Sequence, residues 1–188
     1  MKKPAVFMDR DGTVNEQMGY INHLSRFVLL PGAGKAIRLL NEAGYLAIIV
    51  SNQSGVARGY FPIDLVHRVH DKMKTIIKED GAILDGIYFC PHYPNGKVPP
   101  YGMICDCRKP GTGLIRKAGS SFDIDMENSY VIGDRCTDIE MAHRAGLKGI
   151  MVKTGYGMGD LEYVFPEFPF QPFHVAEDLL DAVKWILG

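Results

Sequence analysis

Two patterns of hydrophobic positions alternate along the chain. Short runs made almost wholly of apolar residues, each ended by polar residues or glycine, are typical of buried strands. Between them, apolar residues recur every three or four positions, as Ala36, Ile37, Leu40 and Ala43 do, which predicts helices. The predicted strands cover residues 5–8, 45–50, 86–89, 130–132 and 149–152, and the predicted helices cover residues 32–43, 62–78, 113–119, 138–145 and 178–187.

Strands that alternate with amphipathic helices predict an α/β fold, with a parallel sheet covered by helices on both faces. Ligands of such sheets bind beyond the carboxyl ends of the strands. Asp9 and Asp11, Ser51, a Cys/His segment from residue 90 and Asp134 each follow a predicted strand, so we expect them at one edge. We expect one domain, residues 1–188, in which the Pro- and aromatic-rich stretch 156–173 is a surface loop anchored by aromatic side chains.

The composition is that of a folded, soluble protein. Of the 188 residues, 46% are hydrophobic and 23% charged, which excludes disorder, and the net charge of −1 argues against a nucleic-acid partner. No apolar stretch approaches the length of a membrane span, and the charges at residues 9–11 interrupt any export signal. We therefore expect a cytoplasmic protein without a membrane partner, and a monomer by default.

The segment Asp9-Arg10-Asp11-Gly12-Thr13 carries the clearest chemical signal. Two carboxylates two residues apart in extended chain point the same way, and such like charges do not both ionise easily. One can then act as a nucleophile while the other holds a proton, and Mg²⁺ would relieve the repulsion. Taken alone, the segment is also compatible with an ordinary turn, which Asp and Gly favour.

Three further segments support the functional interpretation. Gly133-Asp134 follows a strand, and Asp138 lies four residues later, where an acid at a helix N-terminus is also expected. The segment 51–55 offers a hydroxyl and backbone N–H groups for a phosphate. Lys109 follows Arg108, and on their own the two residues are equally compatible with a solvated basic pair.

Asp-x-Asp-Gly-Thr, a strand-ending Ser, a Lys and Gly-Asp-x-x-x-Asp, in this order, resemble the motif set of the haloacid dehalogenase (HAD) superfamily of phosphatases. The resemblance implies a three-layer Rossmann-like fold and an aspartyl-phosphate mechanism. Asp9 would be the nucleophile and Asp11 the general acid and base. Ser51 and Lys109 would bind the transferring phosphoryl group. Magnesium would be held by Asp9, the backbone carbonyl of Asp11, and Asp134.

The cysteines predict a second metal site. Three of the four lie close together in sequence, beside a histidine, and three thiolates with one imidazole form a complete tetrahedral set for a structural zinc ion. Disulfides and free thiols are the alternatives, although one residue between two cysteines is awkward for pairing. Zinc would fix the loop 93–104 and seat Arg108 and Lys109, while Cys136 is expected to be an unpaired thiol in the core or at a helix start. The predicted ligands are Cys90, His92, Cys105 and Cys107.

The segments Cys-Pro-His and Cys-Asp-Cys-Arg-Lys-Pro resemble those of zinc-containing HAD phosphatases without a large cap domain, which are sugar bisphosphate phosphatases and histidinol-phosphate phosphatases. The long loop between the cysteine pairs, the segment 51–59 and Met18-Gly19-Tyr20 resemble the sugar bisphosphate group. The implied activity removes the 7-phosphate of a heptose 1,7-bisphosphate during surface-polysaccharide synthesis. Arg135 receives no side-chain role, and an inactive zinc-stabilised binding module is the alternative of another class. The substrate contacts implied are Gln17, Met18, Gly19, Tyr20, Ser51, Asn52, Gln53, Ser54, Arg108 and Lys109.

Overall fold

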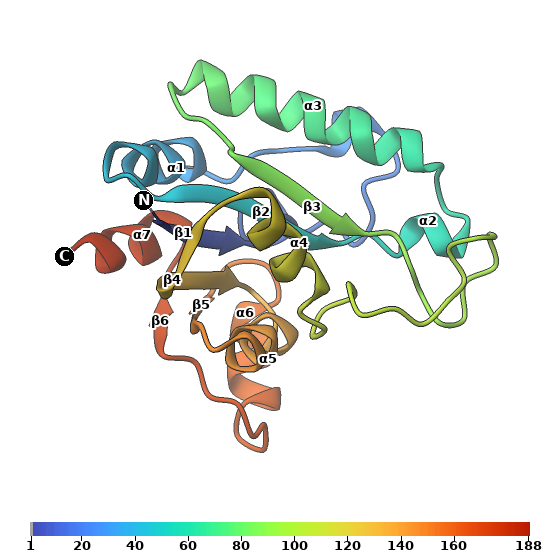
Figure 1. Ribbon diagram of the computed structural model, residues 1–188. Helices are drawn as coiled ribbons and strands as arrows, with labels where there is room; N and C mark the ends of the chain where they lie inside the picture. The colour runs from blue at the N-terminus through green and yellow to red at the C-terminus, as the bar shows by residue number, and fades with distance from the viewer. Residues whose placement is uncertain (1) are drawn as a thin grey trace.

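The strands of the computed structural model, which describes residues 2–188, form one six-stranded sheet in the order β3-β2-β1-β4-β5-β6 (Figure 1). Every neighbouring pair is parallel, as predicted, and Met1 of the expected domain lies outside the described residues. The strands are β1 (Lys3–Met8), β2 (Leu46–Asn52), β3 (Gly86–Cys90), β4 (Ile124–Gly133), β5 (Lys148–Val152) and β6 (His174–Ala176). The helices are η1 (Leu24–Arg26), α1 (Ala33–Glu42), α2 (Gly55–Arg58), α3 (Ile63–Glu79), α4 (Gly113–Ser121), α5 (Cys136–Ala145), α6 (Gly157–Gly159), the π-helix η2 (Asp160–Val164) and α7 (Leu179–Leu187).

The core lies on both faces of the sheet. Val6 and Met8 of β1 pack into the cluster beneath α1, α3 and α7, whereas Ala5 and Phe7 pack into the cluster beneath α4 and α5. This division follows from the two-residue repeat of a strand, which sends alternate side chains to opposite faces. The result is the expected three-layer architecture, and the segments between strands in residues 2–188 contain no second sheet (Figure 1).

The strands differ from the sequence prediction at their polar ends. β2 continues through Ser51 and Asn52, which pair with Phe89 and Cys90 of β3. β4 begins at Ile124, because its polar first half pairs with the start of β1 at the rim of the sheet. The edge strand β6 was not predicted. All three differences arise where backbone pairing, which hydrophobic periodicity does not report, sets the strand limits.

The aromatic-rich stretch 156–173 is more ordered than the predicted surface loop. It contains α6 and η2, and Phe165 is 4% exposed in a small cluster with Ile139 and Met151. The predicted aromatic anchoring is therefore confirmed for Phe165, while the expectation of an irregular loop is wrong for residues 157–164. The stretch also extends toward the edge of the sheet where the predicted site residues gather.

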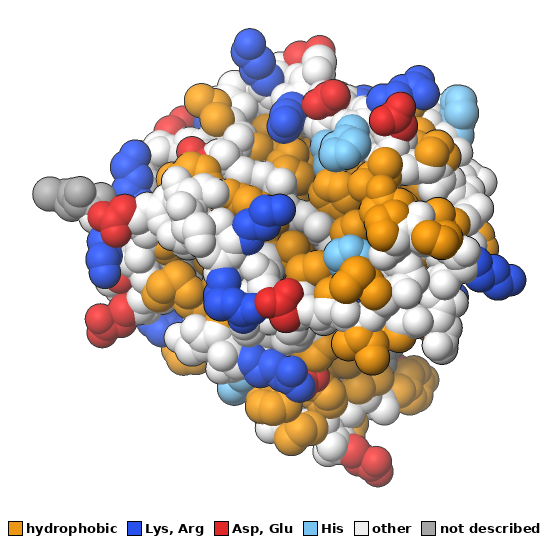
Figure 2. Space-filling view, turned by 45° about the vertical axis from the view of Figure 1, so that its right-hand side comes forward, with side chains coloured by type: hydrophobic (Ala, Val, Ile, Leu, Met, Phe, Trp, Pro, Cys, Tyr) orange, Lys and Arg blue, Asp and Glu red, His pale blue; other side chains and the backbone are white. Residues whose placement is uncertain are grey.

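The surface facing the viewer in Figure 2 intersperses Lys and Arg side chains with Asp and Glu side chains, and hydrophobic side chains gather toward its right. In residues 2–188, none of the helices combines the length and the apolar character that a membrane crossing requires. The carboxyl ends of β1 and β4 lie level, since Met8 pairs with Ile132, and this edge of the sheet carries the candidate site.

Candidate active site

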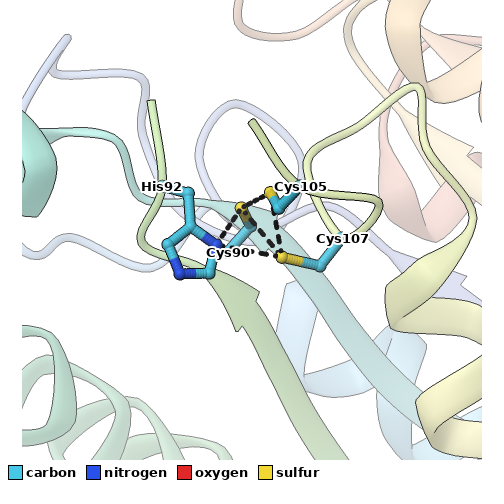
Figure 3. A group of neighbouring side chains, drawn as sticks. All are labelled: Cys90, His92, Cys105 and Cys107. Carbon is cyan, nitrogen blue, oxygen red and sulfur yellow. Dashed lines mark hydrogen bonds between the residues drawn. The ribbon is translucent and has the colours of Figure 1, made fainter. Parts of the chain in front are cut away.

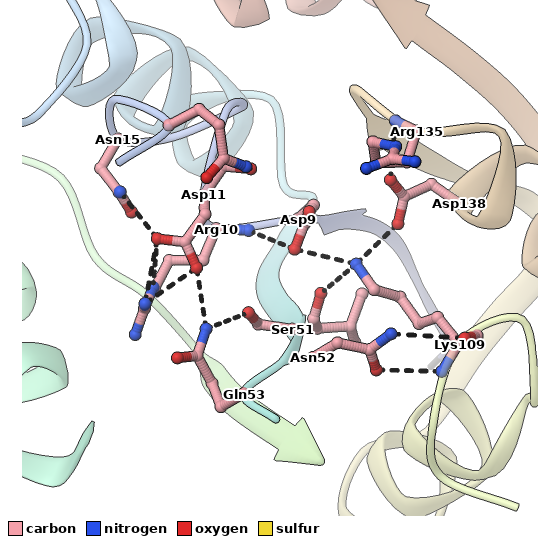
Figure 4. Close-up of polar contacts among 12 residues, drawn as sticks. Asp9, Arg10, Asp11, Asn15, Ser51, Asn52, Gln53, Lys109, Arg135 and Asp138 are labelled. Carbon is pink, nitrogen blue, oxygen red and sulfur yellow. Dashed lines mark hydrogen bonds and ion pairs between the residues drawn. The ribbon is translucent and has the colours of Figure 1, made fainter. Parts of the chain in front are cut away.

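The carboxylates of Asp9, Asp134 and Asp138 and the ammonium of Lys109 meet where β1 and β4 end. Figure 4 shows Lys109 between Asp9 and Asp138. The Lys109 ammonium lies 2.8 Å from Asp9 Oδ1 and 2.6 Å from Asp138 Oδ1, and it donates to the Val50 carbonyl oxygen at 3.1 Å. Asp9, Lys109 and Asp138 are each less than a tenth exposed. Residues that are distant in sequence are thus held in one buried ion cluster, as the motif order predicted for Asp9 and Lys109.

The electrostatics of the cluster are dominated by burial. Removal from water, opposed by Lys109, raises the pKa of Asp9 to about 6. Burial and the charges of Asp9 and Asp138 raise the pKa of Asp134 to about 8. Although burial alone would lower it, the pKa of Lys109 is raised because Asp138 and Asp9 stabilise the ammonium. With every group ionised, the three carboxylates and the lysine leave an excess of two negative charges, which a divalent cation would neutralise.

The donor set around Asp134 fits magnesium. Carboxylate oxygens of Asp9, Asp134 and Asp138 lie within 4.8 Å of one another, and hard oxygen ligands are those that Mg²⁺ prefers. Asp134 is 0% exposed, and its Oδ1 is a buried atom without a hydrogen-bond partner. Its Oδ2 accepts from the Tyr156 N–H at 2.8 Å. An orphaned buried carboxylate oxygen is costly unless a cation or water satisfies it, so Asp134 is suited to hold a metal.

Gly12 explains why a glycine follows the second aspartate of the first motif. It has φ of +90°, and a Cβ atom at this position would lie 2.1 Å from Asp134 Oδ2. Any side chain would therefore push Asp134 out of the cluster. The Gly12 carbonyl oxygen also accepts from the Thr154 hydroxyl at 2.6 Å, which ties the first motif to the segment after β5.

The Asp11 carboxylate is separate from this cluster. Arg10 donates to it from Nη2 at 2.8 and 3.0 Å, while Asn15 donates at 3.0 Å and Gln53 at 2.8 Å. Burial acts to raise the pKa of Asp11, but the Arg10 guanidinium and these hydrogen bonds outweigh it, so the pKa lies below the ordinary value. The expected repulsion between Asp9 and Asp11 is therefore a minor effect, and the carboxylates that crowd Asp9 are those of Asp134 and Asp138.

The end of β2 supplies a polar wall. Gln53 Nε2 donates to Ser51 Oγ at 2.9 Å as well as to Asp11. The Asn52 side chain binds the backbone of Lys109 on both sides, accepting from its N–H at 3.0 Å and donating to its carbonyl oxygen at 3.3 Å. Asn52, a predicted substrate contact, therefore fixes the position of Lys109 and also lines the cavity.

A cavity of about 330 Å³ opens above these groups, a size suited to a small molecule. Two predicted substrate contacts do not line it. Met18 packs against the hydrophobic core instead, because its side chain is apolar, and Ser51 is 1% exposed beneath Gln53. The predicted residues that do line the cavity are Asp9, Asp11, Gln17, Gly19, Tyr20, Asn52, Gln53, Ser54, Arg108 and Lys109.

The predicted zinc ligands form a second cluster beyond β3 (Figure 3). The three sulfur atoms of Cys90, Cys105 and Cys107 lie 3.2–3.4 Å apart, and His92 Nδ1 lies 3.3 Å from Cys107 Sγ and 3.7 Å from Cys90 Sγ. Ligands at the corners of a zinc tetrahedron would lie about 3.5–3.8 Å apart, given Zn–S bonds of about 2.3 Å. The four cysteines form no disulfide, and the donor set fits zinc. Burial raises the pKa of the Cys90 thiol, whose proton a bound metal would displace.

Arg108 connects the zinc cluster with the cavity. It follows Cys107 directly, its Nη1 donates to the His92 carbonyl oxygen at 3.4 Å, and its guanidinium lies 5.2 Å from the Tyr93 ring centroid. Arg108 and Lys109 both line the cavity, but the Lys109 ammonium lies against Asp9 whereas the Arg108 guanidinium lies against His92 and Tyr93. The two basic residues would therefore contact different parts of a molecule bound in the cavity.

The chain is similar to known proteins over almost its whole length. The family model described as HAD-hyrolase-like matches residues 106–182. A protein of Thermosynechococcus vestitus named D-glycero-D-manno-heptose-1,7-bisphosphate 7-phosphatase is 43% identical over 190 residues, which cover 99% of this chain and 96% of the relative. The chain belongs to the heptose 1,7-bisphosphate 7-phosphatase family. The resemblance drawn from the sequence motifs is thereby confirmed.

Two further comparisons support membership of the heptose 1,7-bisphosphate 7-phosphatase family. The Escherichia coli K12 protein, named for the β-anomer of the same substrate, is 39% identical over 153 residues, covering 81% of this chain and 80% of the relative. The crystal structure of the D,D-heptose 1.7-bisphosphate phosphatase from B. bronchiseptica, complexed with magnesium and phosphate, has a TM-score of 0.86 at 31% identity and covers 98% of both chains. The HAD-like fold is thus shown for this chain as well.

Several residues of the site were missed or given no role in the sequence interpretation. Arg135, Thr137 and Tyr156 form a further wall of the cavity, where Arg135 Nε donates to Asp160 Oδ2 at 3.1 Å and its guanidinium lies 4.6 Å from the Tyr156 ring centroid. The Asp160 carboxylate also accepts from the Cys136 N–H at 2.8 Å, so Cys136 lies at a helix start, as predicted. Nothing in the aromatic-rich stretch marks Tyr156 and Asp160 as site residues, because only the fold brings them to the end of β4.

Proposed function

We propose that the protein is a magnesium-dependent phosphatase that removes the 7-phosphate of D-glycero-D-manno-heptose 1,7-bisphosphate and leaves heptose 1-phosphate. The observation that carries the proposal is the buried cluster of Asp9, Asp134 and Asp138 around Lys109, below a cavity with Arg108 in its wall. A nucleophile, a cationic partner and a metal-ligand set occur together, as phosphoryl transfer requires. Family membership supplies the substrate class.

In the first step, an Asp9 carboxylate oxygen attacks the phosphorus of the 7-phosphate. The bond between phosphorus and the sugar oxygen breaks, and its electron pair goes to that oxygen, which takes a proton from Asp11 and leaves as the C7 alcohol. Arg10, Asn15 and Gln53 hold the Asp11 carboxyl group for this transfer. Asp11 takes up its proton when an anionic phosphate binds beside it, since a nearby negative charge raises a carboxyl pKa.

In the second step, water attacks the phosphorus of the aspartyl-phosphate. Asp11, now a carboxylate, accepts the water proton, the bond to Asp9 breaks, and inorganic phosphate leaves. Lys109 stabilises the charge on the phosphoryl oxygens in both steps, because its ammonium already lies 2.8 Å from the attacking carboxylate. Ser51 lies beneath Gln53 rather than in the cavity wall, so the predicted contact of its hydroxyl with the phosphoryl group would need the Gln53 side chain to move aside when phosphate binds.

The residues that would hold magnesium are Asp9, Asp134 and the backbone carbonyl of Asp11, with Asp138 beside them. When bound, the ion would neutralise the phosphoryl charge and the excess negative charge of the carboxylates. A zinc ion bound by Cys90, His92, Cys105 and Cys107 would have a structural role, because four protein ligands leave no position for water. It would fix the segment that carries Arg108.

Arg108 is the residue we assign to the second phosphate. A guanidinium grips phosphate oxygens in pairs, and Arg108 faces a different wall from Lys109. The remaining implied contacts, Gln17, Gly19, Tyr20, Asn52, Gln53 and Ser54, would surround the sugar. Histidinol phosphate lacks the second phosphate that Arg108 would bind, and a binding module without activity would have no need of a nucleophile buried against a lysine.

The biological setting follows from the same proposal. The reaction would belong to the nucleotide-heptose pathway of surface polysaccharide. We propose that residues 1–188 act as one domain, with its zinc loop at 90–107, as a monomer in the cytoplasm. Cell fractionation and the molar mass in solution would test the last two points.

The experiment that tests the proposed activity compares kcat/KM, with magnesium, for both anomers of heptose 1,7-bisphosphate and for histidinol phosphate. We expect one heptose bisphosphate to exceed histidinol phosphate by about tenfold or more, because it makes one more charged contact. The reverse order would contradict the substrate. A purified, zinc-loaded protein that hydrolyses no phosphate ester would favour the binding module.

A further inference from the structure

His70 interrupts an otherwise apolar surface of α3. The six buried residues of this helix are Leu65, Val66, Val69, His70, Met73 and Ile77, and His70, which is 5% exposed, is the polar one among them. Its ring packs edge-on against Phe89, with ring centroids 5.3 Å apart. A histidine in such a place must find a hydrogen-bond partner, since an unpaired buried polar group is costly.

The partner is Arg10, the residue between the two aspartates of the first motif. Arg10 Nη1 lies 3.2 Å from His70 Nε2, and Arg10 is 2% exposed. A guanidinium only donates hydrogen bonds, so Nε2 must be the acceptor and the imidazole must be neutral. Burial, reinforced by the Arg10 charge, lowers the pKa of His70 to about 3, in agreement with this geometry.

Arg10 in turn holds Asp11. Its Nη2 contacts both carboxylate oxygens, at 2.8 and 3.0 Å, and its Nε contacts one of them at 3.3 Å. These N–H groups and the one facing His70 lie on different edges of one rigid plane, so fixing the Nη1 edge fixes the orientation of the edge that grips Asp11. His70 therefore ties Asp11 to the core helix α3, through a single intermediate side chain.

We propose that His70 is a positioning residue for proton transfer, which accepts a hydrogen bond from Arg10 and thereby fixes the Asp11 carboxyl group beside the leaving oxygen. The inference rests on the proposed role of Asp11. Because proton donation matters most when the leaving group is a poor one, loss of His70 should harm alkyl esters more than aryl esters. A purely structural role would lower both alike.

The test uses kcat/KM, which reports the step that cleaves the leaving group. The substrates are heptose 1,7-bisphosphate, phenyl phosphate and p-nitrophenyl phosphate, in order of improving leaving group. The variants are His70→Leu, which removes the acceptor, and His70→Gln, whose amide oxygen has a similar reach. His67→Leu is the matched control, because exposed His67 packs edge-on against the same Phe89 ring, at 5.5 Å between ring centroids, on the same helix.

We expect His70→Leu to lower kcat/KM about tenfold for the sugar ester, a change of about 1.4 kcal/mol, and about twofold or less for p-nitrophenyl phosphate. His70→Gln should stay within about threefold of the unmodified protein, and His67→Leu should match it. Thermal unfolding checks that each variant folds. If His70→Leu does not fold, His70→Asn, whose amide is polar but too short, replaces it.

Equal losses on the sugar and aryl esters would overturn the inference, as would a glutamine variant as impaired as the leucine variant. Asp11→Asn separates this failure from that of the proposed function. If Asp11→Asn shows the steep dependence on leaving group and the His70 variants do not, only the role of His70 is wrong. If Asp11→Asn shows no such dependence, the proposed role of Asp11 fails. If the heptose ester is not a substrate, the comparison of phenyl phosphate with p-nitrophenyl phosphate still measures the dependence on the leaving group.

Discussion

Replacing Arg108 by alanine should separate recognition of the second phosphate from catalysis. The Arg108 side chain makes one long hydrogen bond within the protein, 3.4 Å to the His92 carbonyl oxygen, and its guanidinium lies 5.2 Å from the Tyr93 ring centroid. Most of its five N–H groups therefore remain available to a ligand. The variant should lose no more than about 1 kcal/mol of stability, since an exposed cation–π contact contributes about 0.5–1 kcal/mol.

The effect on recognition should be larger. A hydrogen bond to a charged group contributes about 1.5–3 kcal/mol, which corresponds to about 10- to 150-fold in kcat/KM. We expect this loss for heptose 1,7-bisphosphate, mainly through KM, and less than about threefold for heptose 7-phosphate, which lacks the second phosphate. Arg108→Lys should fall between, because an ammonium keeps the charge without the planar fork.

The assay is steady-state phosphate release from the two sugars, with Arg116→Ala as the control. Arg116 is a surface arginine, 59% exposed, that pairs with Asp106 outside the cavity. The reasoning is refuted if Arg108→Ala loses the same factor on both sugars, because Arg108 would then not bind the second phosphate. A loss confined to kcat would equally contradict a role in binding.

Three further predictions concern the metals and the acids. Asp9→Asn should abolish steady-state turnover because an amide does not attack phosphorus, whereas Asp11→Asn should still bind magnesium and substrate in calorimetry; turnover by a verified Asp9→Asn protein would remove the nucleophile assignment. Metal analysis should find about one zinc per chain, and Cys107→Ser should lower both zinc content and the melting temperature; a zinc-free protein that is folded and fully active would contradict this. Because the folded-state pKa values of Asp9 and Asp134, about 6 and about 8, lie above the ordinary 3.8, the metal-free protein loses stability as pH rises from about 4 to about 8. Magnesium removes that cost, so the rise in melting temperature that it causes should be larger near pH 8 than near pH 5, and an equal or opposite trend would be inconsistent with these carboxylates as ligands.

The sheet was predictable because the apolar runs at residues 5–8 of β1 and 46–50 of β2 are buried, as short apolar runs in the strands of an α/β fold commonly are. β6 was not, since its three residues pair only at the sheet edge and carry no pattern of their own. The polar ends of β2 and β4 were missed for the same reason. The pattern of hydrophobic residues in the sequence indicates which side chains are buried. It does not indicate where polar segments pair through their backbones.

The residues of the site also fall into those that the sequence predicts and those that only the fold brings together. Asp9, Lys109 and Asp134 could be predicted because each belongs to a recognisable motif. The cluster of three cysteines and one histidine could be predicted because these residue types in such spacing are typical of a metal site. Arg10, His70 and Tyr156 could not, because their roles depend on contacts between elements far apart in sequence. For His70 one signal existed: a polar residue at a core position of an amphipathic helix, which marks a buried hydrogen bond without identifying its partner.

The central claim is that this site cleaves the phosphate at C7 and spares the one at C1. A ³¹P NMR time course of heptose 1,7-bisphosphate with the protein and magnesium follows both phosphates at once. We predict that the C7 signal decays as inorganic phosphate appears, while the C1 signal persists as heptose 1-phosphate, and that Asp9→Asn leaves both signals unchanged. Loss of the C1 signal first, or hydrolysis that Asp9→Asn does not stop, would contradict the account.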